Sequence, residues 1–253
     1  MTPPSRVAAC LATLVTATAL TSGCAASTSP HGHTITRGTT DSPAPGPQQP
    51  GTSKPTPPPA PGKADPLAGH QLITVTARSY GATFAELTAY QRAGGRWQRI
   101  LGPWTARIGR NGFAPPGGKR EGDGRTPSGS FRIPFFFGAL QNPGFRFPYR
   151  RAHTYDFWDD DPASPLYNEW VDTRYASAGV NPEPMDVSAY DYGAVIGYNT
   201  AQTPGMGSAI FLHVNIGIAT AGCVTLPMRK LLTVLRWVDP ARSPRIQLGV
   251  GEG

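Results

Sequence analysis

The sequence predicts a mainly β domain, a sandwich or barrel, that follows a non-globular N-terminal segment. Short runs rich in β-branched and aromatic residues recur from residue 71 onward, between glycine and proline turns. One stretch alone has the apolar spacing of an amphipathic helix. Of the 28 prolines of the 253-residue chain, 13 crowd the first 66 residues. What remains is roughly 185 residues, the size of one domain.

The first residues have the composition of an export signal. Arg6 precedes an apolar, alanine-rich stretch, Val7–Leu20, which is shorter than the about 20 residues that span a bilayer. Small residues then lead to Cys24, a pattern that resembles the lipobox of bacterial lipoproteins, with Thr21 where that motif usually has leucine. We expect residues 1–23 to be a signal peptide and Cys24 to be lipidated. The alternative is an ordinary signal peptide and a secreted protein.

Residues 24–66 are expected to form an extended spacer. Segments such as Ser42–Pro47 and Lys54–Pro61 are too rich in proline to form a helix or a sheet, because proline lacks the N–H donor and fixes φ. The folded domain is therefore predicted to occupy residues 67–253.

The strands and the helix of this domain can be placed from their patterns. A single helix is expected over 227–238, with apolar residues at i, i+3, i+4 and i+7, Pro227 in its first turn and Pro240 beyond its end. Strands are predicted at 71–77, on both sides of Gly94-Gly95, at 105–109, 129–135, 194–198, 209–214 and 245–249.

The net charge of +7 favours an anionic partner in the cell envelope. No stretch clusters lysine and arginine in the way that a nucleic-acid surface does, so no nucleic acid is expected.

The cysteines isolate one residue. Cys10 lies in the expected signal peptide and Cys24 at the expected lipidation site, so Cys223 is the one thiol of the predicted domain. An unpaired thiol in an exported protein is unusual, because oxidising compartments favour disulfides. Cys223 is thus either a reactive group or a small buried apolar residue.

A histidine lies ten residues before this cysteine. His213 ends one apolar run, and Cys223 follows Gly222 at the start of the next. Imidazole can take the proton of a thiol whose pKa is otherwise near 8.5, which creates a nucleophile. We interpret Cys223 as the nucleophile, His213 as the general base and later acid, and the Gly222 backbone N–H as an oxyanion donor. In the alternative interpretation, His213 belongs to the core.

Two sequence blocks resemble the L,D-transpeptidases, the YkuD-like catalytic domain. Thr220-Ala221-Gly222-Cys223-Val224 resembles the family's Ser/Thr-x-Gly-Cys-Ile/Val signature, and Arg125-Thr126-Pro127-Ser128-Gly129-Ser130-Phe131 resembles its Thr-Pro-x-Gly-x-Phe segment. The resemblance implies a YkuD-like β-sandwich or barrel-like domain with one or two short helices. It also implies acyl transfer by cysteine on peptidoglycan stem peptides, giving 3→3 cross-links, without a metal or cofactor.

Several positions depart from the family pattern. Val214 and Thr225 replace the usual glycine and arginine, and the distance from histidine to cysteine is shorter than usual. Either Asn215 or a backbone carbonyl is expected to orient His213. Tyr198, Asn199 and Thr220 are the residues predicted to contact substrate.

An insertion over about 139–192 separates the two blocks. Its Asp159-Asp160-Asp161 run favours a solvated acidic turn over a calcium site, since the EF-hand glycine and distal glutamate are absent. Its tryptophans and tyrosines are expected to form either a lid over the substrate or part of the core.

The preferred prediction is a monomeric, lipid-anchored L,D-transpeptidase on the outer face of the cell membrane or in the wall. A carboxypeptidase or hydrolase with the same Cys–His pair, and a non-catalytic wall-binding lipoprotein, are the alternatives.

Overall fold

The structure, a computed structural model, describes residues 69–251. This part of the chain is mainly β, as the sequence predicts, with one α-helix, α1 (Met228–Trp237), and two short 3₁₀ helices, η1 (Ser188–Tyr190) and η2 (Pro240–Arg242). The strands are β1 (Gln71–Ala77), β2 (Phe84–Ala93), β3 (Arg96–Arg107), β4 (Gly129–Arg132), β5 (Phe136–Gly138), β6 (Tyr149–Arg151), β7 (Asp156–Asp159), β8 (Glu169–Asp172), β9 (Glu183–Pro184), β10 (Gly193–Val195), β11 (Phe211–Val214), β12 (Val224–Leu226) and β13 (Arg245–Val250).

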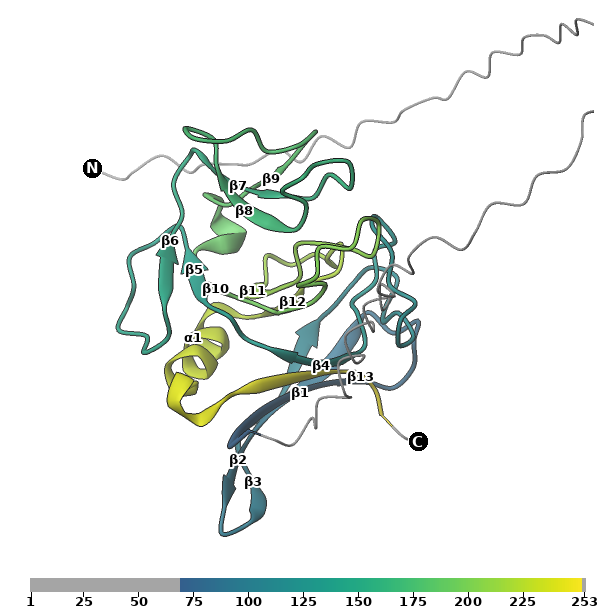
Figure 1. Ribbon diagram of the computed structural model, residues 1–253. Helices are drawn as coiled ribbons and strands as arrows, with labels where there is room; N and C mark the ends of the chain where they lie inside the picture. Colours follow the sequence, from purple (N-terminus) through teal and green to yellow (C-terminus); the bar gives the residue numbers. More distant parts are fainter. Residues whose placement is uncertain (1–68, 252–253) are drawn as a thin grey trace, which may run out of the picture. The chain divides into compact units, whose positions relative to one another are not determined.

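Ten strands form one mixed sheet and three form a small antiparallel sheet. The large sheet has the order β4-β13-β1-β2-β3-β12-β11-β10-β5-β6, and the small one has the order β8-β7-β9. In Figure 1 the small sheet lies on one side of β10, β11 and β12, whereas α1 lies on the other. The central strands are therefore covered on both faces.

The first and last strands were predicted closely. The strand expected at 71–77 is β1, and the one expected at 245–249 is β13; they pair in parallel over six residue pairs. The expected glycine turn joins β2 to β3, and both of its glycines have left-handed backbones (φ 56° and 77°), which glycine adopts without steric cost. Long β-branched runs and glycine turns thus predicted these elements.

The helix packs its apolar stripe on the large sheet. Leu231, Val234 and Leu235 are fully buried in the main core, where Leu212 and Val224 of the central strands also lie. Pro227 occupies the N-cap position of the helix. The apolar spacing and the flanking prolines predicted both ends of the helix within one residue. Among residues 69–251, α1 is the longest helix, and no helix there has the length and apolar character needed to cross a bilayer.

The insertion supplies the small sheet and a second core. Trp158 of β7, Tyr190 of η1 and Met185 are buried together with Phe211 and Cys223. These aromatic residues are thus core residues on the face that carries the cysteine. The acidic run forms a turn, but the expectation that this turn is solvated is wrong for Asp159, which is fully buried. Asp159 and Asp161 instead accept backbone N–H groups, including those of Gly179 and Val180. No cluster of residues within 69–251 has a metal-binding arrangement.

The predictions for residues 1–68 lie outside the described residues. They include the signal peptide over 1–23, lipidation of Cys24 and the spacer over 24–66.

Candidate active site

Parallel pairing of β11 with β12 places the two predicted catalytic residues on one face. Leu212 pairs with Val224 and His213 pairs with Thr225, so Cys223, one residue before β12, is level with Phe211. Successive side chains of a strand point to opposite faces. His213 and Cys223 therefore share the face toward the insertion, while Leu212 and Val224 enter the main core.

The thiol is held by backbone groups. Cys223 Sγ donates to the Ala209 carbonyl oxygen at 3.1 Å and accepts from the Phe211 N–H at 3.3 Å. The side chain is 7% exposed. Burial raises the pKa of Cys223 far above its usual range, and the negative charge of Glu183 raises it further, against weaker opposing effects of the Phe211 N–H and of Lys119. The thiol is therefore protonated in this conformation.

The imidazole is neutral and fixed in one orientation. His213 Nδ1 lies 3.1 Å from the carbonyl oxygens of both Ala189 and Val214, which can only accept, so Nδ1 carries the proton. Burial lowers the pKa of His213 to about 4, although both carbonyls favour the charged form. Nε2 is left as the basic atom. The Tyr190 ring packs edge-on against the imidazole, with centroids 4.9 Å apart.

No hydrogen bond joins Cys223 to His213 among the described residues. Both groups donate instead to backbone carbonyls. The thiol donates to Ala209, and the imidazole Nδ1 donates to Ala189 and Val214. The fold thus brings the predicted pair to one face and leaves them unlinked in the resting conformation.

Asn215 does not orient the histidine. Its Oδ1 accepts from the Gly217 N–H at 2.7 Å, which closes a local turn after β11. Of the two alternatives that the sequence left open, the backbone carbonyl is the one observed. The reason is that an asparagine side chain readily bonds the backbone two residues ahead.

Thr220 and Gly222 build the turn that presents the cysteine. Thr220 Oγ1 donates to the Cys223 carbonyl at 2.6 Å and accepts from the Gly222 N–H at 3.2 Å. The predicted oxyanion donor is therefore occupied in this conformation, and the Thr220 hydroxyl is engaged in the turn. A Cβ on Gly222 would lie 3.0 Å from the Arg125 carbonyl oxygen, so a side chain at this position would press on the neighbouring backbone.

Tyr198 and Asn199 lie in a tight segment that Asn168 links to Ala209. Tyr198 lines a small cavity of about 170 Å³ together with Trp158 and Asn168, but its hydroxyl donates to the Met206 carbonyl at 2.6 Å. Asn199 has a left-handed backbone (φ 48°), and its side chain bonds the backbone of Thr203 and Gly207. Tyr198 thus borders a cavity, whereas Asn199 serves a turn.

Polar residues that the sequence did not single out surround this face. Tyr190 OH donates to Glu183, whose pKa burial raises to about 7. Tyr167 OH and Ser208 Oγ both donate to Glu121. Thr225 Oγ1, on the residue that pairs with His213, is buried and has no hydrogen-bond partner within 69–251. No local motif marks these residues, because their contacts join segments far apart in the chain.

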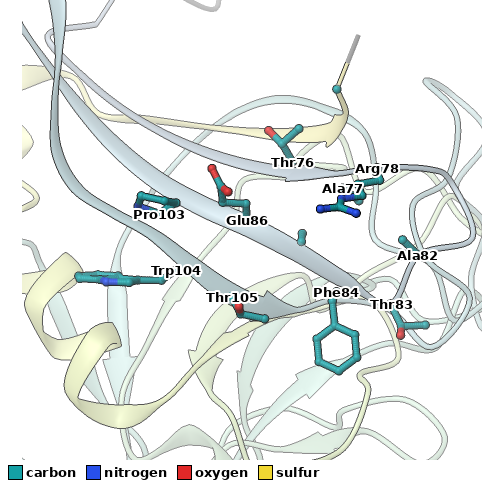
Figure 2. Close-up of a pocket in the computed structure, with 12 residues that line it drawn as sticks. Thr76, Ala77, Arg78, Ala82, Thr83, Phe84, Glu86, Pro103, Trp104 and Thr105 are labelled. Atoms are coloured by element: carbon teal, nitrogen blue, oxygen red, sulfur yellow. The ribbon is translucent and has the colours of Figure 1, made fainter. Parts of the chain in front are cut away.

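A groove larger than the cavity beside Tyr198 lies elsewhere. It has a volume of about 810 Å³ and lies over β1, β2 and β3, where Figure 2 shows Glu86, Phe84 and Trp104 along it. Neither Cys223 nor His213 lines it. Size alone would therefore point away from the residues that carry the chemistry.

Comparison with known proteins agrees with the two sequence blocks. The family model of the L,D-transpeptidase catalytic domain (YkuD) matches residues 85–246, more than half of the chain. A solved structure, that of the helical cell shape determining protein Pgp2 from Campylobacter jejuni, is similar at 13% identity with a TM-score of 0.35. The similarity covers 73% of this chain and 49% of that one, so the chain spans about half of its length. The curated proteins contain no match.

Proposed function

Because the chain belongs to the L,D-transpeptidase catalytic domain family, we propose that it is a cysteine-dependent acyltransferase that acts on peptidoglycan stem peptides. The observation that carries this proposal is the shared face of Cys223 and His213. Cys223 is the one cysteine in the matched segment, and His213 offers a neutral, basic Nε2 on that face.

The first half-reaction forms an acyl-enzyme. The thiol turns from the Ala209 carbonyl toward His213. Its proton passes to Nε2 as Sγ attacks the carbonyl carbon of the third stem residue, in the peptide bond that follows this residue. The carbon–nitrogen bond then breaks. The leaving D-alanine takes the proton from the imidazole, and the donor remains as a thioester on Cys223.

The second half-reaction returns the thiol. The side-chain amine of a neighbouring stem's diamino acid attacks the thioester, and its proton passes to His213 Nε2. The carbon–sulfur bond breaks, a 3→3 peptide bond forms, and the imidazole returns the proton to the sulfur. The Ala189 and Val214 carbonyls support these steps, because they keep the proton on Nδ1 and the lone pair on Nε2. No metal or organic cofactor takes part in these steps.

The Gly222 N–H is the candidate oxyanion donor. The Gly222 N–H bonds Thr220 at a long 3.2 Å, so a developing negative charge on the substrate oxygen can replace that acceptor at small cost.

The location follows from the N-terminal sequence. We propose that residues 1–23 direct export, that Cys24 carries a lipid, and that the spacer over 24–66 places a monomeric domain of residues 67–253 near the wall.

A carbapenem tests the proposal. We expect the full chain to gain the mass of one opened carbapenem on the peptide that contains Cys223, measured by mass spectrometry. Cys24→Ser should leave this adduct unchanged, and Cys223→Ser should lose it. Muropeptide products then separate cross-linked dimers from trimmed monomers. A folded protein that gains no adduct at Cys223 would overturn the proposal.

A further inference from the structure

Asn168 connects the insertion to the segment that holds the thiol. It lies directly before β8 with a left-handed backbone (φ 62°), and its N–H donates to the Asp159 carbonyl at 2.7 Å. Asparagine adopts this conformation more readily than other residues with a Cβ. The small sheet therefore gives the side chain a fixed starting point.

The Asn168 amide uses its full hydrogen-bonding capacity. Oδ1 accepts from the Ala209 N–H at 3.1 Å and from Trp158 Nε1 at 3.0 Å. Nδ2 donates to the carbonyls of Tyr198 at 3.1 Å and Asn199 at 3.0 Å. An amide offers two donors and two acceptor lone pairs, so all four are engaged and the group cannot turn without breaking several bonds.

Ala209 depends on this support. Its φ is 51°, a left-handed conformation that is unfavourable for alanine and that persists where neighbouring contacts hold it. Asn168 binds the N–H of Ala209, and the carbonyl of the same residue accepts the Cys223 thiol at 3.1 Å. Ala209 is thus the one residue that lies between Asn168 and the sulfur in this series of hydrogen bonds.

A second connection runs through the aromatic core. Trp158, which donates to Asn168, packs edge-on against Phe211 with centroids 4.9 Å apart. The Phe211 N–H donates to the sulfur at 3.3 Å. The thiol therefore has two hydrogen-bond partners, Ala209 and Phe211. Asn168 contacts the first, and Trp158, which is bonded to Asn168, contacts the second.

We infer that Asn168 is a positioning residue that, through Ala209, holds the Cys223 thiol in its protonated resting position. A carbonyl acceptor stabilises S–H over the thiolate. Loss of the Asn168 side chain lets Ala209 relax, which frees the thiol to ionise and to turn toward His213. The importance of this restraint for enzymatic turnover rests on the proposed function. The effect of Asn168 on the ionisation of the thiol does not rest on it.

Alkylation of the full chain by iodoacetamide tests the inference. The rate at Cys223 is followed across pH by mass spectrometry of its peptide, which separates it from Cys10 and Cys24. Asn168→Gly removes the side chain and keeps a residue that tolerates positive φ. We expect its Cys223 to react about tenfold faster near neutral pH, with the profile moved to lower pH, as a fall of about one unit in the thiol pKa produces.

Asn168→Asp should not accelerate alkylation. Aspartate loses the two donor bonds to the Tyr198 and Asn199 carbonyls but keeps the acceptor for Ala209. Its added negative charge also opposes ionisation of the thiol, so alkylation should be no faster than in the native chain. This variant also decides the outcome should Asn168→Gly fail to fold: faster alkylation of Asn168→Asp would overturn the inference.

Asn142→Gly is the matched control. Asn142 makes three hydrogen bonds in the same insertion, all to Gly144 and Phe145, and none to the thiol's segment. We expect its alkylation profile to be native. Equal acceleration in Asn142→Gly and Asn168→Gly, or an unmoved profile in Asn168→Gly, would overturn the inference.

The carbapenem experiment keeps the two proposals apart. A shifted alkylation profile in a chain that forms no carbapenem adduct supports the positioning role and contradicts the proposed function. A carbapenem adduct in the native chain, with an unmoved profile in Asn168→Gly, gives the reverse result.

Discussion

His213 Nδ1 lies 3.1 Å from the carbonyl oxygen of Ala189, a residue of the insertion. The segment that separates the two family blocks therefore fixes the tautomer of the predicted base together with the Val214 carbonyl. It also buries the imidazole, because Tyr190 of the same segment packs against it. The state of this histidine is thus set in part by residues of the insertion, which no motif near His213 contains.

We expect His213 to titrate near pH 4. Burial lowers its pKa to about 4 from 6.5, so the unfolded chain binds more protons between these values and stability is lost as pH falls through this window. Nitrogen NMR of the imidazole should report the midpoint and the Nδ1–H tautomer. His213→Gln should lose this pH dependence of the free energy of unfolding. A midpoint near 6.5 would contradict the prediction.

Glu183 should act in the opposite direction. Burial raises its pKa from 4.5 to about 7, so the folded state binds more protons between these values and stability falls as pH rises through them. Glu183→Gln keeps an acceptor for Tyr190 and removes the charge. Its unfolding free energy should exceed the native value at about pH 8 but not at about pH 4, by about 1.4 kcal/mol for each unit of pKa difference. The exposed Glu169, changed to Gln, is the control and should have little effect.

Gly222→Ala should destabilise the domain. The added Cβ would meet the Arg125 carbonyl oxygen and Ile210 Cδ1, each at 3.0 Å, which is the kind of overpacking that costs about 1–3 kcal/mol. Urea unfolding measures the change. Gly81→Ala is the control, since no atom lies within 4 Å of its Cβ position. Equal effects of the two substitutions would show that packing does not require glycine at 222.

Thr220→Val should also be destabilising. It removes the Oγ1 bonds to the Cys223 carbonyl and from the Gly222 N–H, and each bond contributes about 0.5–1.5 kcal/mol. Thr220→Ser keeps both bonds and should retain more stability and more carbapenem acylation. A native rate of acylation in Thr220→Val would contradict a role of this turn in presenting the thiol.

The same type of substitution at Thr225 should have the opposite effect on stability. Thr225 Oγ1 is buried without a partner in the described chain, and an unsatisfied buried hydroxyl costs about 1–3 kcal/mol. Thr225→Val replaces it by a methyl group of similar shape, so the melting temperature should stay level or rise. A clear loss of stability would mean that this hydroxyl has a partner in solution.

The sequence predicted the regular elements better than the insertion. β1, β13 and α1 follow from β-branched runs and an apolar stripe, whose periods depend on local geometry alone. Strand β4 ends at Arg132, before Pro134, although alternation continued to 135. The small sheet of the insertion was not predicted, because its strands are two to four residues long and are stabilised by aromatic packing from elsewhere in the chain.

For the candidate site, the sequence predicted chemical groups but not their partners. Cys223 and His213 stood out by residue type and spacing, and parallel pairing explains why they share a face. Ala189 and Ala209 contribute only backbone carbonyls, which any residue provides, so no sequence signal could mark them. The roles of Cys223, His213 and Gly222 in catalysis stay predictions until the thiol is tested.

The position of β13 has a consequence for biogenesis. This strand lies between β4 and β1, so each of these two earlier strands has an unpaired edge until β13 is added. The ribosome or a translocation channel must release residue 250 before the large sheet can close. A nascent chain therefore cannot complete this sheet before residue 250 emerges, a delay suited to the export that the N-terminal sequence predicts. Truncation just before residue 245 should prevent folding altogether, although it would spare every predicted catalytic residue.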